Sequence, residues 1–208
     1  MDVQFHGANC LTITTKQARL TIDDNLADLG GKSVTKAGDV VLFTGAHADP
    51  LQSAKIVIGQ PGEYEVSGVS IYGIAARSHM DEEGRLSATM YKIVYEDLRL
   101  LVTGHVYPEL SDDQLEAIGM VDAMFVPVGG NGYTLDGVGA LKLVKKVEPK
   151  IVIPTHYETK GLQYPVEQRS LQDALQGMAM EPSETVPKLK LKSGSLGDAM
   201  RLLVLEQS

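Results

Sequence analysis

The amino-acid sequence predicts an α/β or α+β fold in which mixed β-sheets form a sandwich with helices on the outside. The first half of the chain consists of short apolar runs rich in β-branched residues and separated by turn residues, a pattern typical of strands. The second half alternates strand-like and helix-like segments. With 208 residues, of which 43% are hydrophobic and 22% charged, we expect one domain covering residues 1–208.

Eight strand-like runs precede the first helix. They cover residues 3–5, 10–14, 19–23, 40–43, 55–58, 69–74, 88–95 and 98–103. The last two runs are separated only by Glu96 and Asp97, which predicts a β-hairpin. Glu63 and Tyr64, which lie between the fifth and sixth runs, are interpreted as serving a turn and core packing.

Three helix-like segments follow. Ser111 is placed to cap the first, which ends at Gly119, a residue suited to a helix C-terminus. The second runs from residue 136 to 147, where apolar residues recur on one face, and Pro149 stops it. The third covers residues 166–177. The remaining strand-like runs cover residues 121–128, 151–153, 188–192 and 201–205.

Charge and composition disfavour several classes of protein. A net charge of −8 and a pI of about 5.1 argue against nucleic-acid binding, which usually requires clustered basic residues. No apolar run approaches the roughly 20 residues of a membrane helix, and the N-terminus lacks the features of a signal peptide. Cys10 is the sole cysteine, so the sequence offers no intramolecular disulfide and no Cys-x-x-Cys metal site. We therefore expect a cytoplasmic protein with neither a nucleic-acid nor a membrane partner.

Three of the five histidines lie just beyond predicted strands. They are His47, His105 and His156, and Asp49 lies two residues after the first of them. Side chains at strand ends of layered α/β folds often bind ligands, and imidazole and carboxylate are common metal ligands. A histidine after a strand is more often only a polar residue leaving the core. Three such positions in one chain nevertheless favour a metal or catalytic site.

Two stretches of sequence resemble a known family. Residues 121–136, VDAMFVPVGGNGYTLD, and residues 148–159, EPKIVIPTHYET, are similar to the metallo-β-lactamase superfamily. They most resemble its branch of metal-dependent hydrolases that includes the ascorbate-phosphate lactonase, and PGEYEVSGVSIYGI at residues 61–74 resembles bacterial members. The resemblance runs from about residue 3 to residue 160 and implies a four-layer αββα sandwich.

The metal-binding signature of that superfamily is only half present. Its members carry His-x-His-x-Asp-His after the strand that corresponds to residues 40–43. Aligned with TGAHADP at residues 44–50, the two retained ligands are His47 and Asp49. The other two positions are occupied by Gly45 and Pro50, which supply no ligand.

The later ligand positions are also altered. A family histidine falls near Ala76 or Arg77, and His79 is two or three residues too late to replace it without a bulge. The bridging aspartate of the family falls on His105, and the last family histidine is retained as His156. Without a bridging carboxylate a two-metal site is disfavoured.

The resemblance therefore leaves two hypotheses about function. In the favoured one the metal site is a degraded remnant, the protein is catalytically reduced or silent, and the cleft binds a small molecule, or the acidic surface binds a protein. In the alternative, one ion activates a water that attacks an ester, lactone or phosphodiester. Zinc suits such a site, with manganese or iron as alternatives. The candidate ligands are His47, Asp49, His105 and His156, with His79 as a fifth candidate and Asp49 also a candidate base. Oligomerisation is left open.

Four further residues are weaker candidates. The resemblance places Asp23 and Asp24 near the site, where they could orient a histidine, although an aspartate in a turn is more often structural. Tyr133 and Tyr157 could contact a ligand or simply pack in the core.

Overall fold

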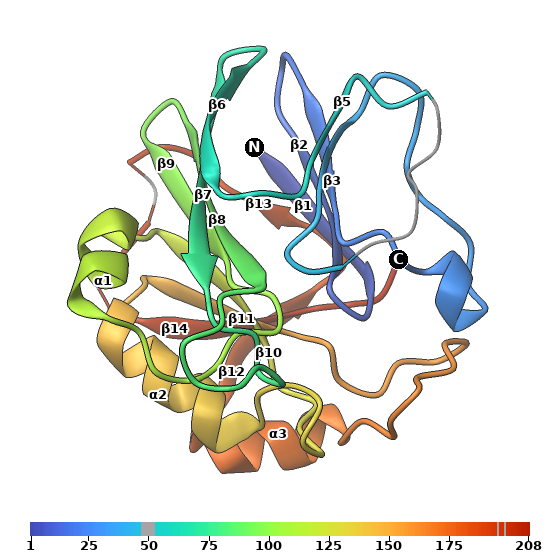
Figure 1. Cartoon of the computed structure of the whole chain (residues 1–208), viewed down its shortest axis with the longest axis vertical. Coiled ribbons are helices and arrows are strands. Elements are labelled where there is room, and N and C mark those ends of the chain that lie inside the picture. Colours follow the sequence, from blue (N-terminus) through green and yellow to red (C-terminus); the bar gives the residue numbers. More distant parts are fainter. Residues whose placement is uncertain (47–52, 195, 198) are drawn as a thin grey trace.

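The computed structural model describes residues 1–46, 53–194, 196–197 and 199–208, and its centre is a pair of β-sheets (Figure 1). The smaller sheet has the strand order β13-β1-β2-β3-β4-β5. Its strands are β1 (Asp2–Gly7), β2 (Cys10–Thr14), β3 (Arg19–Ile22), β4 (Val40–Leu42), β5 (Ile56–Ile58) and β13 (Leu189–Lys190). Strand β2 is antiparallel to both of its neighbours, β1 and β3, and β4 and β5 continue the sheet in parallel with β3.

The larger sheet has the strand order β12-β14-β11-β10-β9-β8-β7-β6. Its strands are β6 (Gly62–Val66), β7 (Val69–Ala76), β8 (Ala88–Tyr95), β9 (Leu98–Val102), β10 (Ala123–Pro127), β11 (Ile151–Thr155), β12 (Pro182–Val186) and β14 (Arg201–Leu205). The first four are antiparallel neighbours, whereas β9, β10, β11, β14 and β12 run parallel. The order of antiparallel strands followed by alternating strands and helices was predicted and is confirmed.

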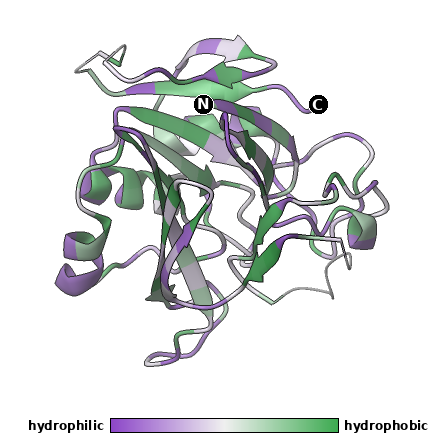
Figure 2. Cartoon of the chain, turned by 90° about the horizontal axis from the view of Figure 1, so that it is seen from above, coloured by the Kyte–Doolittle hydropathy of each residue, from purple (hydrophilic) through white to green (hydrophobic). Residues whose placement is uncertain are grey.

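The hydrophobic core fills the space between the two sheets. Phe5, Leu11 and Ile13 of the smaller sheet and Tyr91 and Ile93 of the larger one are completely buried. Figure 2 shows that hydrophobic residues concentrate on the strands and hydrophilic ones on loops and outer helix surfaces. Each large apolar side chain buried in this way contributes about 2 kcal/mol to stability.

Three α-helices lie on the outer side of the larger sheet, where α1 packs against β7, α2 against β10 and α3 against α2 (Figure 1). They are α1 (Asp112–Ile118), α2 (Gly137–Val147) and α3 (Leu171–Met178), and a 3₁₀ turn, η1 (Ala27–Leu29), follows β3. Each α-helix begins with a side-chain cap on a backbone amide, supplied by Ser111, Asp136 and Ser170 respectively. No helix in the described ranges is long and apolar enough to cross a membrane.

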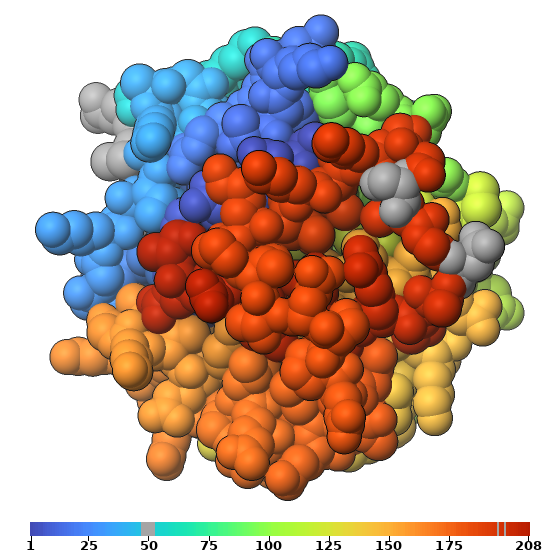
Figure 3. All heavy atoms as spheres, turned by 180° about the vertical axis from the view of Figure 1, so that it is seen from behind, coloured from blue at the N-terminus to red at the C-terminus, as the bar shows by residue number. Residues whose placement is uncertain are grey.

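The C-terminal segment ties the two sheets together. β12 and β14 extend the larger sheet, while β13, which lies between them in sequence, pairs with β1 of the smaller sheet. Ser208 N also donates to Phe5 O at 2.9 Å. In the view from behind, this orange-to-red segment spreads over the middle of the face below the blue N-terminal strands (Figure 3).

Three expectations from the sequence need correction. The third helix begins at Leu171 rather than residue 166, because Ser170 caps it and Arg169 N is hydrogen-bonded to Gly129 O. Glu63 and Tyr64 belong to strand β6, whose alternation of exposed and half-buried residues pairs with β7. Strand β12 was not predicted, because its residues are mostly exposed at a sheet edge and carry no apolar run.

Close packing between α2 and α3 gives a test of the fold. A Cβ added to Gly137 would lie 2.2 Å from Ala174 O and 2.9 Å from Met178 N, both backbone atoms that cannot move aside cheaply. We expect Gly137→Ala to lower the free energy of unfolding by about 2 kcal/mol or more, measured by urea denaturation. Gly139→Ala on the same helix is the control, since its closest new contact is the flexible Leu135 side chain. Equal effects of the two substitutions would contradict the close helix contact.

Candidate functional site

The carboxyl ends of the central strands meet at one edge of the larger sheet, because β9, β10 and β11 run parallel. His105 follows β9 and His156 follows β11, so the topology brings both residues to this edge. A cavity of about 230 Å³ lies there, and its lining includes both histidines, Tyr133, Asp23 and Thr44. Open α/β sheets commonly bind ligands at this edge.

The two histidines are in direct contact. Their rings meet edge to face, with 4.4 Å between centroids and 80° between planes. The Tyr133 ring lies 5.0 Å from that of His105 and 5.8 Å from that of His156. Burial lowers the pKa of His156 to about 4 and that of His105 well below its usual range, where the nearby His156 adds to the effect. Both imidazoles are therefore neutral at pH 7, and each has one nitrogen lone pair available.

Gln168 fixes the tautomer of His156. Its Nε2 donates to Val166 O at 2.6 Å, which identifies the other terminal atom as the amide oxygen. That oxygen lies 3.0 Å from His156 Nδ1 and can only accept, so Nδ1 carries the proton. The lone pair of His156 is therefore on Nε2, as in histidines that bind a metal through Nε2 and are oriented through Nδ1.

His105 presents an unpaired nitrogen. Its Nδ1 is buried and has no hydrogen-bond partner within the described part of the chain. A buried polar atom left in this state costs about 1–3 kcal/mol, a cost that a bound group would remove.

The backbone beside the histidines is held in uncommon conformations. Gly104, which precedes His105, has φ of 62°, and a Cβ there would lie 2.2 Å from Thr44 Oγ1. His156 itself has φ of 49°, and its N–H donates to Ala8 O at 2.7 Å. Non-glycine residues with such φ values are strained and often occur at functional sites.

Asp23 forms the wall of the cavity on the side of the smaller sheet. Its carboxylate accepts hydrogen bonds from Thr44 N at 2.7 Å and Thr44 Oγ1 at 2.6 Å. Burial raises the pKa of Asp23 to about 6, although the two bonds from Thr44 oppose this shift. These bonds fix the position of Thr44, which lies just after β4. The described hydrogen bonds of the Asp23 side chain go to Thr44 and not to a histidine.

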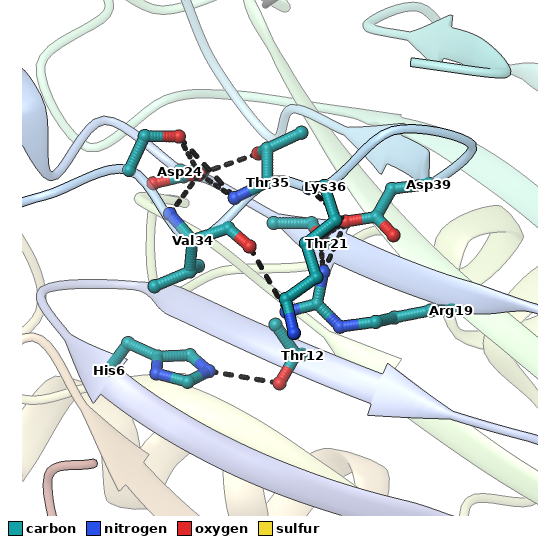
Figure 4. A network of polar contacts seen from close by, with 10 residues as sticks. His6, Thr12, Arg19, Thr21, Asp24, Val34, Thr35, Lys36 and Asp39 are labelled. Atoms are coloured by element: carbon teal, nitrogen blue, oxygen red, sulfur yellow. Dashed lines mark hydrogen bonds and ion pairs between the residues drawn. The ribbon is translucent and has the colours of Figure 1, made fainter. Parts of the chain in front are cut away.

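Asp24 has a structural role in the loop after β3 (Figure 4). Its Oδ2 accepts from Ser33 Oγ, Val34 N, Thr35 N and Thr35 Oγ1 at 2.5–2.9 Å. In the same network Arg19 pairs with Asp39. These bonds hold residues 33–36 against the smaller sheet.

The structure brings only some of the predicted metal ligands together. His105 and His156 are brought together, whereas His47 and Asp49 lie outside the described residues. His79 lines a neighbouring cavity instead, and its backbone N–H donates to His105 O at 2.7 Å. Among the residues that the structure describes, no group of three or more His, Cys, Asp or Glu side chains could hold a metal ion.

The weaker candidates and the unforeseen residues can also be placed. Tyr157 is buried in the core, where its ring lies 5.5 Å from that of Phe5 and its hydroxyl donates to Leu205 O. Tyr133 lines the cavity. Gln168 and Thr44 were not predicted as site residues, because Gln168 was placed inside a helix and Thr44 carried no motif of its own.

The raised pKa of Asp23 gives a pH-dependent prediction for stability. The unfolded chain loses this proton above pH 3.8, whereas the folded chain keeps it to about pH 6, so rising pH in this window lowers the free energy of unfolding. Relative to Asp23→Asn, the wild-type protein should lose about 2 kcal/mol of stability between about pH 4 and pH 7. Urea denaturation of both proteins measures the difference, in which shared titrations such as those of the histidines cancel.

The control is Asp97→Asn in the exposed hairpin turn. The difference in free energy of unfolding between the wild type and this variant should not fall between pH 4 and pH 7. A wild-type minus Asp23→Asn difference that is independent of pH would contradict the assignment.

Comparison with known proteins identifies the family. A family model described as the beta-lactamase superfamily domain matches residues 2–156. A UPF0173 metal-dependent hydrolase from Thermoplasma acidophilum is 25% identical over an alignment of 195 residues. The alignment covers 78% of this chain and 85% of the relative.

Solved structures share the fold at lower identity. A metallo-β-lactamase superfamily protein from Thermotoga maritima matches with a TM-score of 0.75 and 23% identity, covering 99% of this chain and 98% of its own. An isothiocyanate hydrolase from Delia radicum gut bacteria matches with a TM-score of 0.62 and 11% identity, covering 100% and 97%. The predicted metallo-β-lactamase type of sandwich is thereby confirmed. With the family model matching about three quarters of its residues, this chain belongs to the metallo-β-lactamase superfamily.

Proposed function

We propose that this protein is a metal-dependent hydrolase whose cleft holds a single metal ion, with His105 and His156 among its ligands. The similarity to metal-dependent hydrolases implies a metal cofactor. The observation that carries the proposal is the pair of neutral imidazoles at the carboxyl edge of the larger sheet, with the tautomer of His156 set by Gln168.

The residues at the cavity fit one ion better than two. Two imidazoles with one free lone pair each, of which His105 also has a buried Nδ1 without a partner, suit one borderline-soft ion such as zinc, and manganese or iron are alternatives. His47 and Asp49, from the loop after β4, are the proposed additional ligands. Two ions about 3.5–4 Å apart would need a bridging carboxylate. The resemblance places His105 at the position where the family supplies that carboxylate.

The chain's own residues would prepare the site for hydrolysis of an ester, lactone or phosphodiester. When bound, the ion would supply Lewis-acid activation of water and of the scissile group. Gln168 holds the His156 ring with Nε2 unprotonated, and the ring of Tyr133 packs against that of His105. Asp49 is the proposed general base or a further ligand.

A second candidate function is a silent binding cleft. It is favoured by the glycine at position 45, which lines the cavity where the family pattern expects a ligand. It is also favoured by the lack of a three-ligand group among the described side chains. In this candidate the cavity binds a small molecule without chemistry.

Metal content separates the two candidates. Protein purified without added metal and then dialysed against zinc should contain about one equivalent of zinc by elemental analysis. The content should fall by about tenfold in His105→Ala and His156→Ala, because each removes a ligand. His6→Ala is the control, since the His6 ring is hydrogen-bonded to Thr12 Oγ1 of the smaller sheet and does not line the cavity. Less than about a tenth of an equivalent after dialysis against zinc and manganese would sink the hydrolase proposal.

The tautomer argument has its own test. Gln168→Leu removes the acceptor for His156 Nδ1–H without removing a ligand, and outer partners of this kind contribute about 10–100-fold to metal affinity. We expect weaker zinc binding in a competition assay with a chromophoric chelator. Gln172→Leu, an exposed position on α3, should bind zinc as the wild type does. Unchanged affinity in a folded Gln168→Leu protein would show that Gln168 does not orient the ligand.

A further inference from the structure

The described lining of the histidine cavity contains no cationic side chain. Neither Lys nor Arg is among the described residues that surround the cavity, and residues 47–52, 195 and 198, which lie outside the described ranges, include neither of them. Arg77 is next to a lining residue in sequence, but its guanidinium lies 3.9 Å from the centroid of the Tyr107 ring and donates to Asp81 O. The cavity therefore offers no cationic side chain to an anionic group of a ligand.

An anionic substituent in this cavity would remain unpaired. Asp23 is the carboxylic acid of the described lining, and its charged form would repel such a substituent. Taking a charge out of water is costly unless a partner of opposite charge compensates it. The proposed metal ion would compensate charge at the reacting group, where it binds, and not at a distant substituent. The lining therefore selects against substrates that carry an additional negative charge.

Apolar side chains from three separate segments line the same cavity. Leu29 belongs to η1, Met80 to the loop after β7 and Pro165 to the loop before α3. Leu29 is half-buried, Pro165 is exposed, and Met80 is 68% exposed. A ligand that covers these side chains removes apolar surface from water. Apolar walls around a few polar groups are typical of sites for small molecules.

Backbone hydrogen bonds hold the Met80 segment beside the histidine pair. His79 N donates to His105 O at 2.7 Å, and Ser78 forms an antiparallel bridge with Val106. The backbone that carries Met80 is thus fixed relative to His105 before any ligand binds. Its flexible thioether side chain can then adapt to the shape of an apolar group.

We propose that the histidine cavity takes an uncharged ester or lactone whose apolar substituent packs against Met80, Leu29 and Pro165. This inference rests on the proposed hydrolase function for the identity of the reacting bond. It narrows the substrate class, because it excludes phosphodiesters and substrates with a phosphoryl or carboxylate substituent. The volume of about 230 Å³ sets the size of the substrate. An apolar cavity of about 150 Å³ can hold benzene, so this cavity accommodates a ring that carries a small ester group.

Binding of benzamide and benzoate, which have nearly the same shape but differ in charge, tests the inference. The full-length protein, freed of metal with a chelator, is titrated with each compound at pH 7 and constant ionic strength and followed by ¹H–¹⁵N NMR. We expect saturable shifts of the Met80 and Tyr133 amides with benzamide. Benzoate should bind at least about tenfold more weakly, because the lining provides no cationic partner for its carboxylate.

Substitutions of Met80 test the apolar contact. Met80→Gln keeps the length of the side chain but removes apolar surface, so it should weaken benzamide binding by about fivefold. Met80→Leu keeps the apolar surface and should bind benzamide as the wild type does. Met120→Gln is the matched control, since Met120 is 73% exposed and does not line the cavity. The NMR spectra of the variants also report whether they remain folded.

Several outcomes would overturn the inference. They are the absence of saturable shifts with benzamide, benzoate binding as tightly as benzamide, equal weakening by Met80→Gln and Met120→Gln, and a loss in Met80→Leu as large as in Met80→Gln. Because the titrations need no metal and no turnover, failure to bind zinc would defeat the hydrolase proposal and leave their result standing. If both proposals hold, zinc-loaded protein should cleave the acetyl ester of methyl 4-acetoxybenzoate with a kcat/KM at least about tenfold above that for 4-acetoxybenzoate. Equal values of kcat/KM for this uncharged and anionic pair would also overturn the inference.

Discussion

Thr44 connects the two sheets at the candidate site, and the geometry of the cavity depends on its contacts. Its amide and hydroxyl bind Asp23, which follows β3, and its carbonyl accepts from Thr89 N of β8 at 2.8 Å. On its other side Thr44 approaches Gly104 so closely that a Cβ there would overlap it. One side chain therefore fixes the distance between the smaller sheet and the strand end that carries His105. A larger residue at position 104 would move the histidine or separate the sheets.

The polar groups of the cavity are tuned toward neutrality by the same burial. Burial lowers the pKa of His156 to about 4 and raises that of Asp23 to about 6, so both shifts oppose charge inside the protein. A cation bound at the histidines would change this balance, because it would stabilise neutral imidazole ligands and a charged Asp23 together. Burial of these groups therefore costs stability, and a cation bound at the histidines would offset part of that cost.

The sequence predicted the sheets well and the site in part. Strands such as β2 and β8 have strong apolar patterns, and Ser111 is a recognisable cap, so these elements lie where they were expected. His105 and His156 meet because both follow parallel strands, a relation that motif and topology together indicate. Gln168 could not be found in this way. The residues around Gln168 have a helical pattern, but a bond between Arg169 N and Gly129 O, which is distant in sequence, keeps this segment out of the helix. The partner of Gln168, His156, also lies on a different element.

The loop between β10 and α2 is fixed by its own hydrogen bonds, and it positions Tyr133 beside the histidine pair. Tyr133 and Thr134 are adjacent in sequence but line different cavities, so the loop that contains them forms the wall between the histidine cavity and a second cavity of about 450 Å³. This wall is held in place by Gly130 N bonded to Leu135 O, by Asn131 Nδ2 bonded to Glu167 O, and by the Asp136 cap. Because these bonds fix the loop, the Tyr133 ring would be held beside the histidine pair before any ligand binds.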